Sequence, residues 1–127
     1  MVKIVLVTHG HLAQQMLETA GQIIGKPSDD GFATFAVTTA ASVEKEAAKL
    51  HELLKSCEDG ALILTDIFGG SATNISLTAS KDLPQCYVIT GLNLSMLLTA
   101  INSRKKLNAK ELAEKIEADG KRAVINA

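Results

Sequence analysis

The stretch Lys3-Ile4-Val5-Leu6-Val7-Thr8-His9-Gly10-His11 decides the fold of this chain. Its uninterrupted apolar run, residues 4–7, is typical of a parallel β-strand that helices cover on both faces. The strand ends at His9, and sheets of this kind bind ligands beyond the carboxyl ends of their strands. His9 is therefore a candidate functional residue, although a single histidine at this place can also fill a loop and form local hydrogen bonds.

A second stretch repeats the pattern. Residues 61–64 are again apolar, and Thr65-Asp66-Ile67-Phe68-Gly69-Gly70-Ser71 leads from them into a predicted helix over residues 72–79. Because parallel strands end at the same edge of a sheet, we expect His9 and Asp66 to lie side by side. Asp66 could instead be a turn residue that bonds the backbone, which is common in sequences of this kind.

The remaining segments alternate between helical and strand patterns. Apolar residues at helical spacing predict four further helices, over residues 12–24, 42–54, 95–101 and 108–120. Strands are predicted over residues 32–37, 86–89 and 123–125. This alternation indicates βαβ units, and hence a small, open, mostly parallel α/β sheet with helices on both faces. We expect one domain, residues 1–127, in which Gly120 ends the last helix and only Asn102–Leu107 could swing an element away from the body.

Composition excludes several classes of function. The 127 residues include 13 basic and 14 acidic ones, no Trp, one Tyr and three Phe, whereas nucleic-acid binding usually requires a basic face and stacking aromatic residues. No apolar run approaches the ~20 residues of a membrane-spanning helix, and the N-terminal run is shorter than that of a secretion signal. Cys57 and Cys86 are not spaced as a metal site or a disulfide framework. We therefore expect a cytoplasmic protein that neither binds nucleic acid nor inserts into membranes.

The predicted neighbours His9 and Asp66 suit nucleophilic chemistry. A carboxylate that accepts the Nδ1 proton fixes the tautomer of a histidine and leaves Nε2 free to attack. Gly69-Gly70-Ser71 then enters a helix, whose first backbone N–H groups favour phosphate oxygens. Glycines at such a turn can serve the turn alone, and the segment lacks the lysine of a nucleotide-binding P-loop. A single phosphoryl group carried on His9 fits these residues better than a nucleotide.

A rival hypothesis assigns the same residues to a metal. His9, His11 and Asp66 could provide two imidazoles and a carboxylate, with coordination sites left open for water. Two histidines across a junction between strand and helix need not converge, however. His11 is more simply interpreted as the start of the helix, where it faces solvent or a partner.

Together the motifs resemble those of a known family. Thr8-His9-Gly10 after an N-terminal strand, and the segment from Asp66 to Ser71 followed by Asn74, are similar to the IIA component of the mannose-family sugar phosphotransferase system (PTS). The resemblance covers essentially the whole chain in length and order of elements. It implies a phosphotransferase that needs no cofactor or metal. Its site residues would be His9 and Asp66 for catalysis and Gly70, Ser71 and Ala72 for phosphate binding.

The resemblance also implies partners. His9 would accept a phosphoryl group from the phosphohistidine of HPr and pass it to a histidine of a IIB component. Many family members continue into a fused IIB domain, so the acceptor is expected here to be a separate chain or to be missing. The family further suggests a homodimer whose C-terminal strand, here Ala123–Ile125, crosses to the other subunit. An alternative is a regulatory phosphoprotein that binds partners according to its phosphorylation state.

Overall fold

Strands and helices alternate along the chain, as the sequence predicts. Residues 1–40 and 42–127 are described in a computed structural model. Within them the elements are β1 (Lys3–His9), α1 (Leu12–Ile24), β2 (Phe32–Val37), α2 (Val43–Lys55), β3 (Ala61–Thr65), α3 (Ser71–Ser80), β4 (Cys86–Thr90), α4 (Leu94–Ser103) and α5 (Ala109–Arg122). None of the helices described is both long and apolar enough to cross a membrane.

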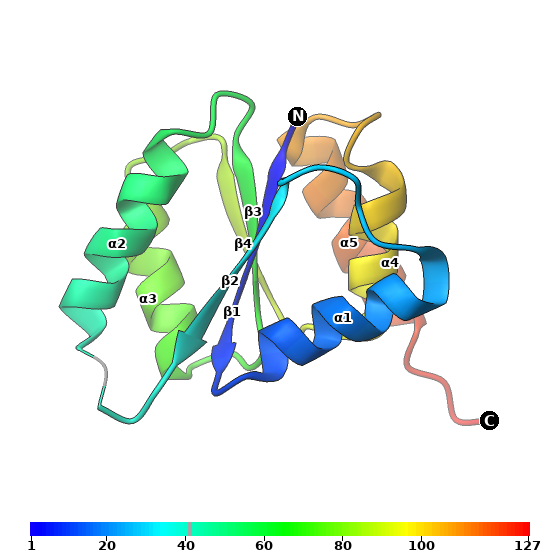
Figure 1. Ribbon diagram of the computed structural model, residues 1–127, viewed down its shortest axis with the longest axis horizontal. Helices are drawn as coiled ribbons and strands as arrows, with labels where there is room; N and C mark the ends of the chain where they lie inside the picture. The colour runs from blue at the N-terminus through cyan, green and yellow to red at the C-terminus, as the bar shows by residue number, and fades with distance from the viewer. Residues whose placement is uncertain (41) are drawn as a thin grey trace.

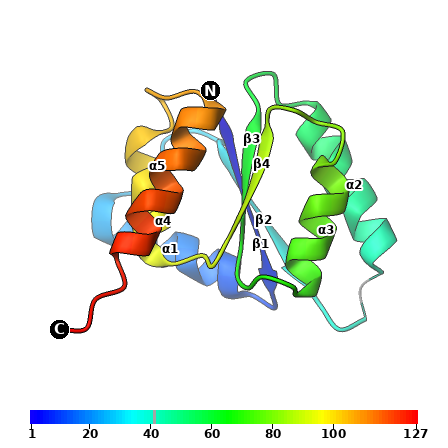
Figure 2. The ribbon, with the colours of Figure 1, turned by 180° about the vertical axis from the view of Figure 1, so that it is seen from behind.

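The four strands form one parallel sheet in the order β2-β1-β3-β4. Helices α2 and α3 cover one face, and α1, α4 and α5 cover the other, as the two views of the ribbon show (Figure 1, Figure 2). In the register of the sheet, His9 lies opposite Val37 of β2, and Val7 lies opposite Thr65 of β3. The prediction of a parallel α/β sheet with helices on both faces is confirmed. The carboxyl ends of β1 and β3 lie at one edge.

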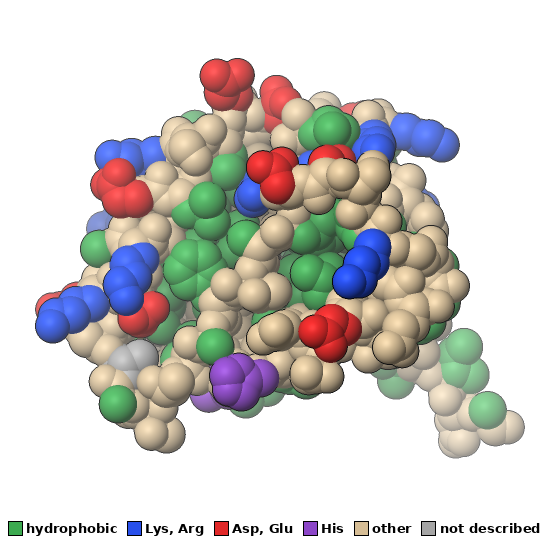
Figure 3. Space-filling model, in the orientation of Figure 1, with side chains coloured by type: hydrophobic (Ala, Val, Ile, Leu, Met, Phe, Trp, Pro, Cys, Tyr) green, Lys and Arg blue, Asp and Glu red, His purple; other side chains and the backbone are tan. Residues whose placement is uncertain are grey.

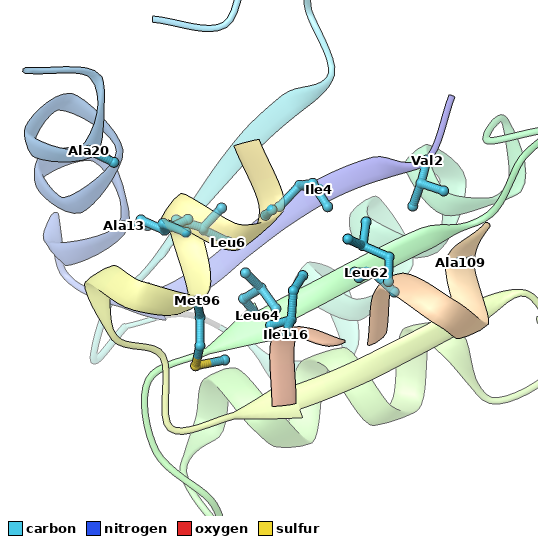
Figure 4. Packing of buried hydrophobic residues seen from close by; sticks show 13 residues of the cluster. Val2, Ile4, Leu6, Ala13, Ala20, Leu62, Leu64, Met96, Ala109 and Ile116 are labelled. Carbon is cyan, nitrogen blue, oxygen red and sulfur yellow. The ribbon is translucent and has the colours of Figure 1, made fainter. Parts of the chain in front are cut away.

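Two hydrophobic cores, one on each face of the sheet, explain the uninterrupted apolar runs. Ile4 and Leu6 of β1 point toward α1, α4 and α5, together with Leu62 and Leu64 of β3 (Figure 4). The intervening residues of both strands belong to the core beneath α2 and α3. Burying one such aliphatic side chain contributes roughly 1.5–3 kcal/mol. The central strands β1 and β3 are thus held firmly on both faces, which fixes the place where each ends.

Helix α1 packs on the sheet through smaller side chains than its pattern suggests. Ala13 and Ala20 are its buried residues, whereas Leu12, Ile23 and Ile24 are exposed. Alanines let a helix backbone approach a neighbour closely, so the larger residues at the helix margins remain at the surface. The predicted helix is correct, but its buried face is shifted from the predicted one.

Helix α5 begins as predicted and ends later. Asn108 and Glu111 form a capping box, in which each side chain accepts a hydrogen bond from the other residue's backbone N–H. The prediction that Gly120 ends the helix is wrong, because Gly120 lies buried within α5, against α4. A Cβ at Gly120 would lie 2.6 Å from Met96 Cγ. The glycine therefore serves close packing of α5 on α4, and the helix continues to Arg122.

The C-terminal residues do not form the predicted strand within this single chain. Ala123 is the C-cap of α5, and residues 124–127 belong to neither helix nor strand. Val124 and Ile125 are exposed, and the C-terminus extends away from the body (Figure 1). A strand needs the edge of another strand as its hydrogen-bonding partner, and this segment pairs with no edge of its own sheet.

The segment Asn102–Leu107 is fixed to the body, contrary to the prediction that it could swing. Arg104 is only 4% exposed, and its Nε donates to the carbonyl of Val2 at 3.0 Å. Its Nη1 donates to both carboxylate oxygens of Asp29 at 2.9 Å. The guanidinium also lies 5.4 Å from the ring centroid of Phe32. An arginine within an Arg-Lys-Lys run is expected in solvent, but this one joins the α4–α5 connection to the residue before β1 and to β2.

Candidate functional site

His9 is the last residue of β1 and lies at the carboxyl edge of the sheet. Its side chain is 47% exposed, and the space-filling view shows histidine at the surface along the edge where β1 ends (Figure 3). Gly10 follows with φ +55° and turns the chain toward α1. The buried hydroxyl of Thr8 accepts a 2.9 Å hydrogen bond from Ala13 N–H, which fixes the start of that helix. The strand and the turn together hold a histidine ring in reach of solvent.

Asp66 contacts His9 through one oxygen at two places. Its Oδ2 lies 2.8 Å from His9 Nδ1 and accepts the backbone N–H of His9 at 2.9 Å. Its Oδ1 accepts the backbone N–H of Ile67 at 3.0 Å. The two residues that the sequence predicts to be neighbours are therefore in direct contact, and the carboxylate is held by three hydrogen bonds.

The pKa of Asp66 and the tautomer of His9 follow from these contacts. Burial raises the pKa of Asp66, but the hydrogen bonds from the His9 backbone, the His9 ring and the Ile67 backbone outweigh it and hold the pKa below its ordinary value of 3.8. Asp66 is consequently a carboxylate at neutral pH and can only accept hydrogen bonds. A neutral His9 must then carry its proton on Nδ1, which leaves a lone pair on Nε2.

The N-terminus of α3 lies beside the His9 ring. A Cβ at Gly70 would lie 3.0 Å from His9 Cε1 and 3.7 Å from Nε2, so only a glycine leaves the ring its present space. Gly70 is the N-cap of α3 and provides no side-chain cap. Ser71, which is exposed, and Ala72 form the first turn, where backbone N–H groups lack partners within a helix and favour anions. Of the three residues predicted to bind phosphate, Gly70 lies beside the His9 ring, and Ser71 and Ala72 follow it directly in α3.

Two buried threonines at this edge were missed by the sequence interpretation. Thr65 ends β3, Thr73 lies in the first turn of α3, and their hydroxyl oxygens are 2.7 Å apart. The Thr73 hydroxyl also donates to the carbonyl of Ile67 at 2.6 Å. The only sequence signal was the placement of one threonine on each side of the Asp66–Gly70 loop.

The structure does not gather the residues of the metal hypothesis. His11 is the exposed N-cap residue of α1 and makes no side-chain cap. Among residues 1–40 and 42–127, no cluster of three or more His, Cys, Asp or Glu side chains could hold a metal ion. His9 and Asp66 therefore stand as a pair in the part of the chain described.

The combination of this fold and this site defines a class, a parallel α/β domain that presents a carboxylate-bound histidine at the sheet edge. Comparisons with known proteins agree. The family model described as "PTS system fructose IIA component" matches residues 3–117. The PTS system mannose-specific EIIAB component of Escherichia coli K12 is 33% identical over 105 residues, which is 81% of this chain and 32% of that protein. The chain thus matches about a third of the length of this curated relative.

Solved structures agree over the whole fold. The phosphotransferase system component EIIA from Streptococcus agalactiae superposes with a TM-score of 0.89 at 26% identity, covering 99% of this chain and 97% of that one. The mannose/sorbose-specific IIA subunit from Enterococcus faecalis gives a TM-score of 0.87 at 31% identity, covering 99% and 94%. The chain belongs to the mannose-type IIA family of the sugar phosphotransferase system, which confirms the resemblance of its motifs.

Proposed function

We propose that this protein is a histidine phosphocarrier of the PTS, which accepts a phosphoryl group from phosphorylated HPr on His9 and passes it to a IIB component. The observation that carries the proposal is the 2.8 Å contact between His9 Nδ1 and Asp66 Oδ2 on a half-exposed ring. This contact orients the ring and leaves Nε2 free to react. Family membership supports the same role.

The proposed reaction moves one phosphoryl group between two imidazoles. The Nε2 lone pair of His9 attacks phosphorus, the P–N bond of the donor phosphohistidine breaks, and the electron pair returns to the donor ring. No proton has to leave Nε2, because the Nδ1–H tautomer already lacks one there. The positive charge that His9 gains is balanced by Asp66. Such a transfer depends chiefly on positioning and on charge stabilisation.

The phosphoryl oxygens are proposed to lie at the start of α3. The backbone N–H groups of Gly70, Ser71 and Ala72 and the hydroxyl of Ser71 would bind them. Support comes from the closeness of Gly70 to the His9 ring and from the affinity of helix N-termini for anions. No cofactor enters this reaction.

Two partner proteins must reach the same histidine in turn, so we propose short-lived interfaces around His9. The exposure of His9 supports this, and Ile67 and Phe68 of the adjoining loop are 57% and 83% exposed. We further propose that residues 1–127 act as one domain and that the protein is cytoplasmic.

We also propose a homodimer in which the C-terminal segment joins the sheet of a second subunit. Val124 and Ile125 are exposed apolar residues outside any helix or strand. Strand β4 is an outer strand of the sheet, and the backbone groups on its free side pair with no other strand of the described residues. Because Arg104 fixes the α4–α5 connection, the exchanged part would begin after α5.

Phosphorylation in a reconstituted system tests the carrier function. The protein is incubated with phosphoenolpyruvate, enzyme I and HPr, and the bound phosphate is measured by intact mass. We expect one acid-labile, alkali-stable phosphate in wild type and in His11→Ala, and none in His9→Ala. Wild-type protein that acquires no phosphate would refute the proposal.

Truncation tests the exchange. Removal of Ala123–Ala127 leaves α5 complete and should convert the dimer to a monomer in multi-angle light scattering. A double change of Val124 and Ile125 to serine, which keeps the chain length, should do the same. A truncated chain that still dimerises as wild type would contradict the exchange.

A further inference from the structure

The buried hydroxyls of Thr65 and Thr73 form a directed chain of hydrogen bonds. A hydroxyl has one hydrogen to donate, and Thr73 donates its hydrogen to the carbonyl of Ile67, which can only accept. The 2.7 Å contact between the two hydroxyls therefore has Thr65 as donor and Thr73 as acceptor. The chain runs from the end of β3, through the first turn of α3, to the loop between them.

Ile67 joins this chain to the carboxylate that orients His9. Its backbone N–H donates to Asp66 Oδ1 at 3.0 Å, and its carbonyl accepts from Thr73 at 2.6 Å. The other oxygen of Asp66 holds the His9 ring. One residue of the loop thus connects the orienting acid to the helix whose N-terminus adjoins Nε2.

Side-chain packing contributes little to holding this loop. Ile67 and Phe68 expose most of their surface, and Gly69 and Gly70 have no side chains to pack. The loop is therefore positioned mainly by backbone and hydroxyl hydrogen bonds. Loss of the bond between Thr73 and Ile67 would let the start of α3 move relative to the His9–Asp66 pair.

We propose that Thr73 is a positioning residue for phosphoryl transfer at His9, acting through the carbonyl of Ile67 and supported by the hydroxyl of Thr65. The inference rests on the proposed function. It adds a residue that touches neither His9 nor the phosphoryl group but sets the distance between the nucleophile and the N–H groups that bind the phosphate oxygens. Displacements on the order of 1 Å can lower a rate about 100-fold, so a partial loosening of the loop should be measurable.

Ser76 provides a matched control on the same helix. It is buried, and its hydroxyl donates to the carbonyl of Ala72 at 2.7 Å. Thr73→Val and Ser76→Ala each remove one buried hydroxyl from α3, but only the first removes a bond to the loop. A purely structural role would make the two variants alike.

The experiment measures phosphoryl transfer from phosphorylated HPr by rapid quench, over a range of HPr concentrations and well below each variant's Tm. We expect Thr73→Val to lower the maximal rate constant roughly 10-fold, with the KM for HPr within about twofold of wild type. Thr73→Ser should restore the rate to within about threefold. Ser76→Ala should lower Tm but leave the rate constant within about twofold.

Several results would overturn the inference. Equal rate constants for Thr73→Val and Ser76→Ala would do so, as would an effect on KM alone. If Thr73→Val does not fold, Thr65→Val decides: it keeps the Thr73–Ile67 bond, and a small loss of rate, about threefold, is expected against none in Ser76→Ala. Wild type that takes up no phosphate refutes the proposed function, whereas normal uptake with wild-type rates in both threonine variants refutes only the role of Thr73.

Discussion

The two edges of the sheet each hold an aspartate paired with a nitrogen group, and the pairs differ in what they leave free. At the amino edge, both oxygens of Asp29 accept from Arg104, whose remaining contacts with Val2 and Phe32 leave it almost fully buried. At the carboxyl edge, Asp66 occupies only one nitrogen of a half-exposed ring. The first pair is saturated and joins three segments of the fold, while the second keeps a nucleophile available.

The glycines near each pair follow the same division. A Cβ at Gly31 would collide with the Arg104 guanidinium, whose Nη2 would be 1.9 Å away. A Cβ at Gly70 would only crowd His9 Cε1 at 3.0 Å. At the amino edge, a side chain at position 31 would have to displace the Arg104 guanidinium. At the carboxyl edge, the space between Gly70 and the His9 ring is narrow but unfilled. We relate this space to the phosphoryl group that His9 is proposed to carry.

The largest effect is expected when the carboxylate at the carboxyl edge is removed. Asp66→Ala deprives His9 of its orienting acid and of the charge that stabilises the reacting ring, so the transfer rate should fall on the order of 100-fold. Rapid-quench measurement of phosphoryl transfer from phosphorylated HPr gives this rate. Asp82→Ala, at an exposed aspartate after α3, is the matched control and should transfer at the wild-type rate. A wild-type rate in Asp66→Ala would show that the pair has no part in the reaction.

A smaller effect on the rate is expected from a methyl group added in the space between Gly70 and the His9 ring. Gly70 has φ −83°, which alanine adopts without strain, so Gly70→Ala should fold normally but displace the His9 ring. We predict a loss of transfer rate of roughly 10-fold. Gly21→Ala, within α1 and away from the site, controls for the added methyl group. Equal rates in the two variants would contradict the proposed contact between Gly70 and the reacting ring.

At the amino edge we predict a change in stability with little change in transfer. Arg104→Met removes the buried guanidinium and leaves Asp29 without its main partner, so Tm should fall on the order of 10 °C. Lys105→Met, at an exposed neighbour 3.9 Å from Asp29 Oδ2, should change Tm far less. Differential scanning calorimetry gives Tm, and the transfer rate should stay near that of wild type. A large loss of transfer rate in Arg104→Met with an unchanged Tm would contradict the structural role given to Arg104.

The smallest effect is expected in the dependence of Tm on acidic pH. The backbone N–H of Gly31 and then the guanidinium of Arg104 hold the pKa of Asp29 below its ordinary value of 3.8. A carboxyl whose pKa is lower in the folded state stabilises the fold above its unfolded pKa, and this contribution disappears as the pH falls through the folded pKa. Between pH 7 and pH 2.5, the Tm of Asp29→Asn should therefore fall less steeply than that of wild type. Parallel curves would show that Asp29 contributes nothing to the acid sensitivity.

The sequence predicted the parallel sheet and the pairing of His9 with Asp66 for one physical reason. Buried central strands show uninterrupted apolar runs, and parallel strands end at the same edge, so the two residues after those runs had to be neighbours. The N-terminus of α3 followed from the glycine pair before it. These features depend on local pattern and on topology, both of which a sequence displays.

The features that sequence reasoning missed depend on contacts between distant segments. Arg104 looks like one of three surface cations until Asp29 and Val2 are placed beside it. Gly120 looks like a helix stop until Met96 is placed against it. Thr65 and Thr73 are ordinary residues until their hydroxyls meet beneath the loop. The strand predicted at Ala123–Ile125 shows a related limit, because a strand pattern does not say which edge, or which subunit, supplies the partner.

The central claim is that the contact with Asp66 occupies Nδ1 and makes Nε2 of His9 the acceptor. It is tested most directly by ¹⁵N and ³¹P NMR of the protein labelled at histidine nitrogen and phosphorylated by HPr. We predict one N-phosphorylated histidine, His9, with its phosphorus coupled to Nε2 while Nδ1 stays protonated. Phosphorus coupled to Nδ1, or phosphate on His11 or His51, would contradict the account.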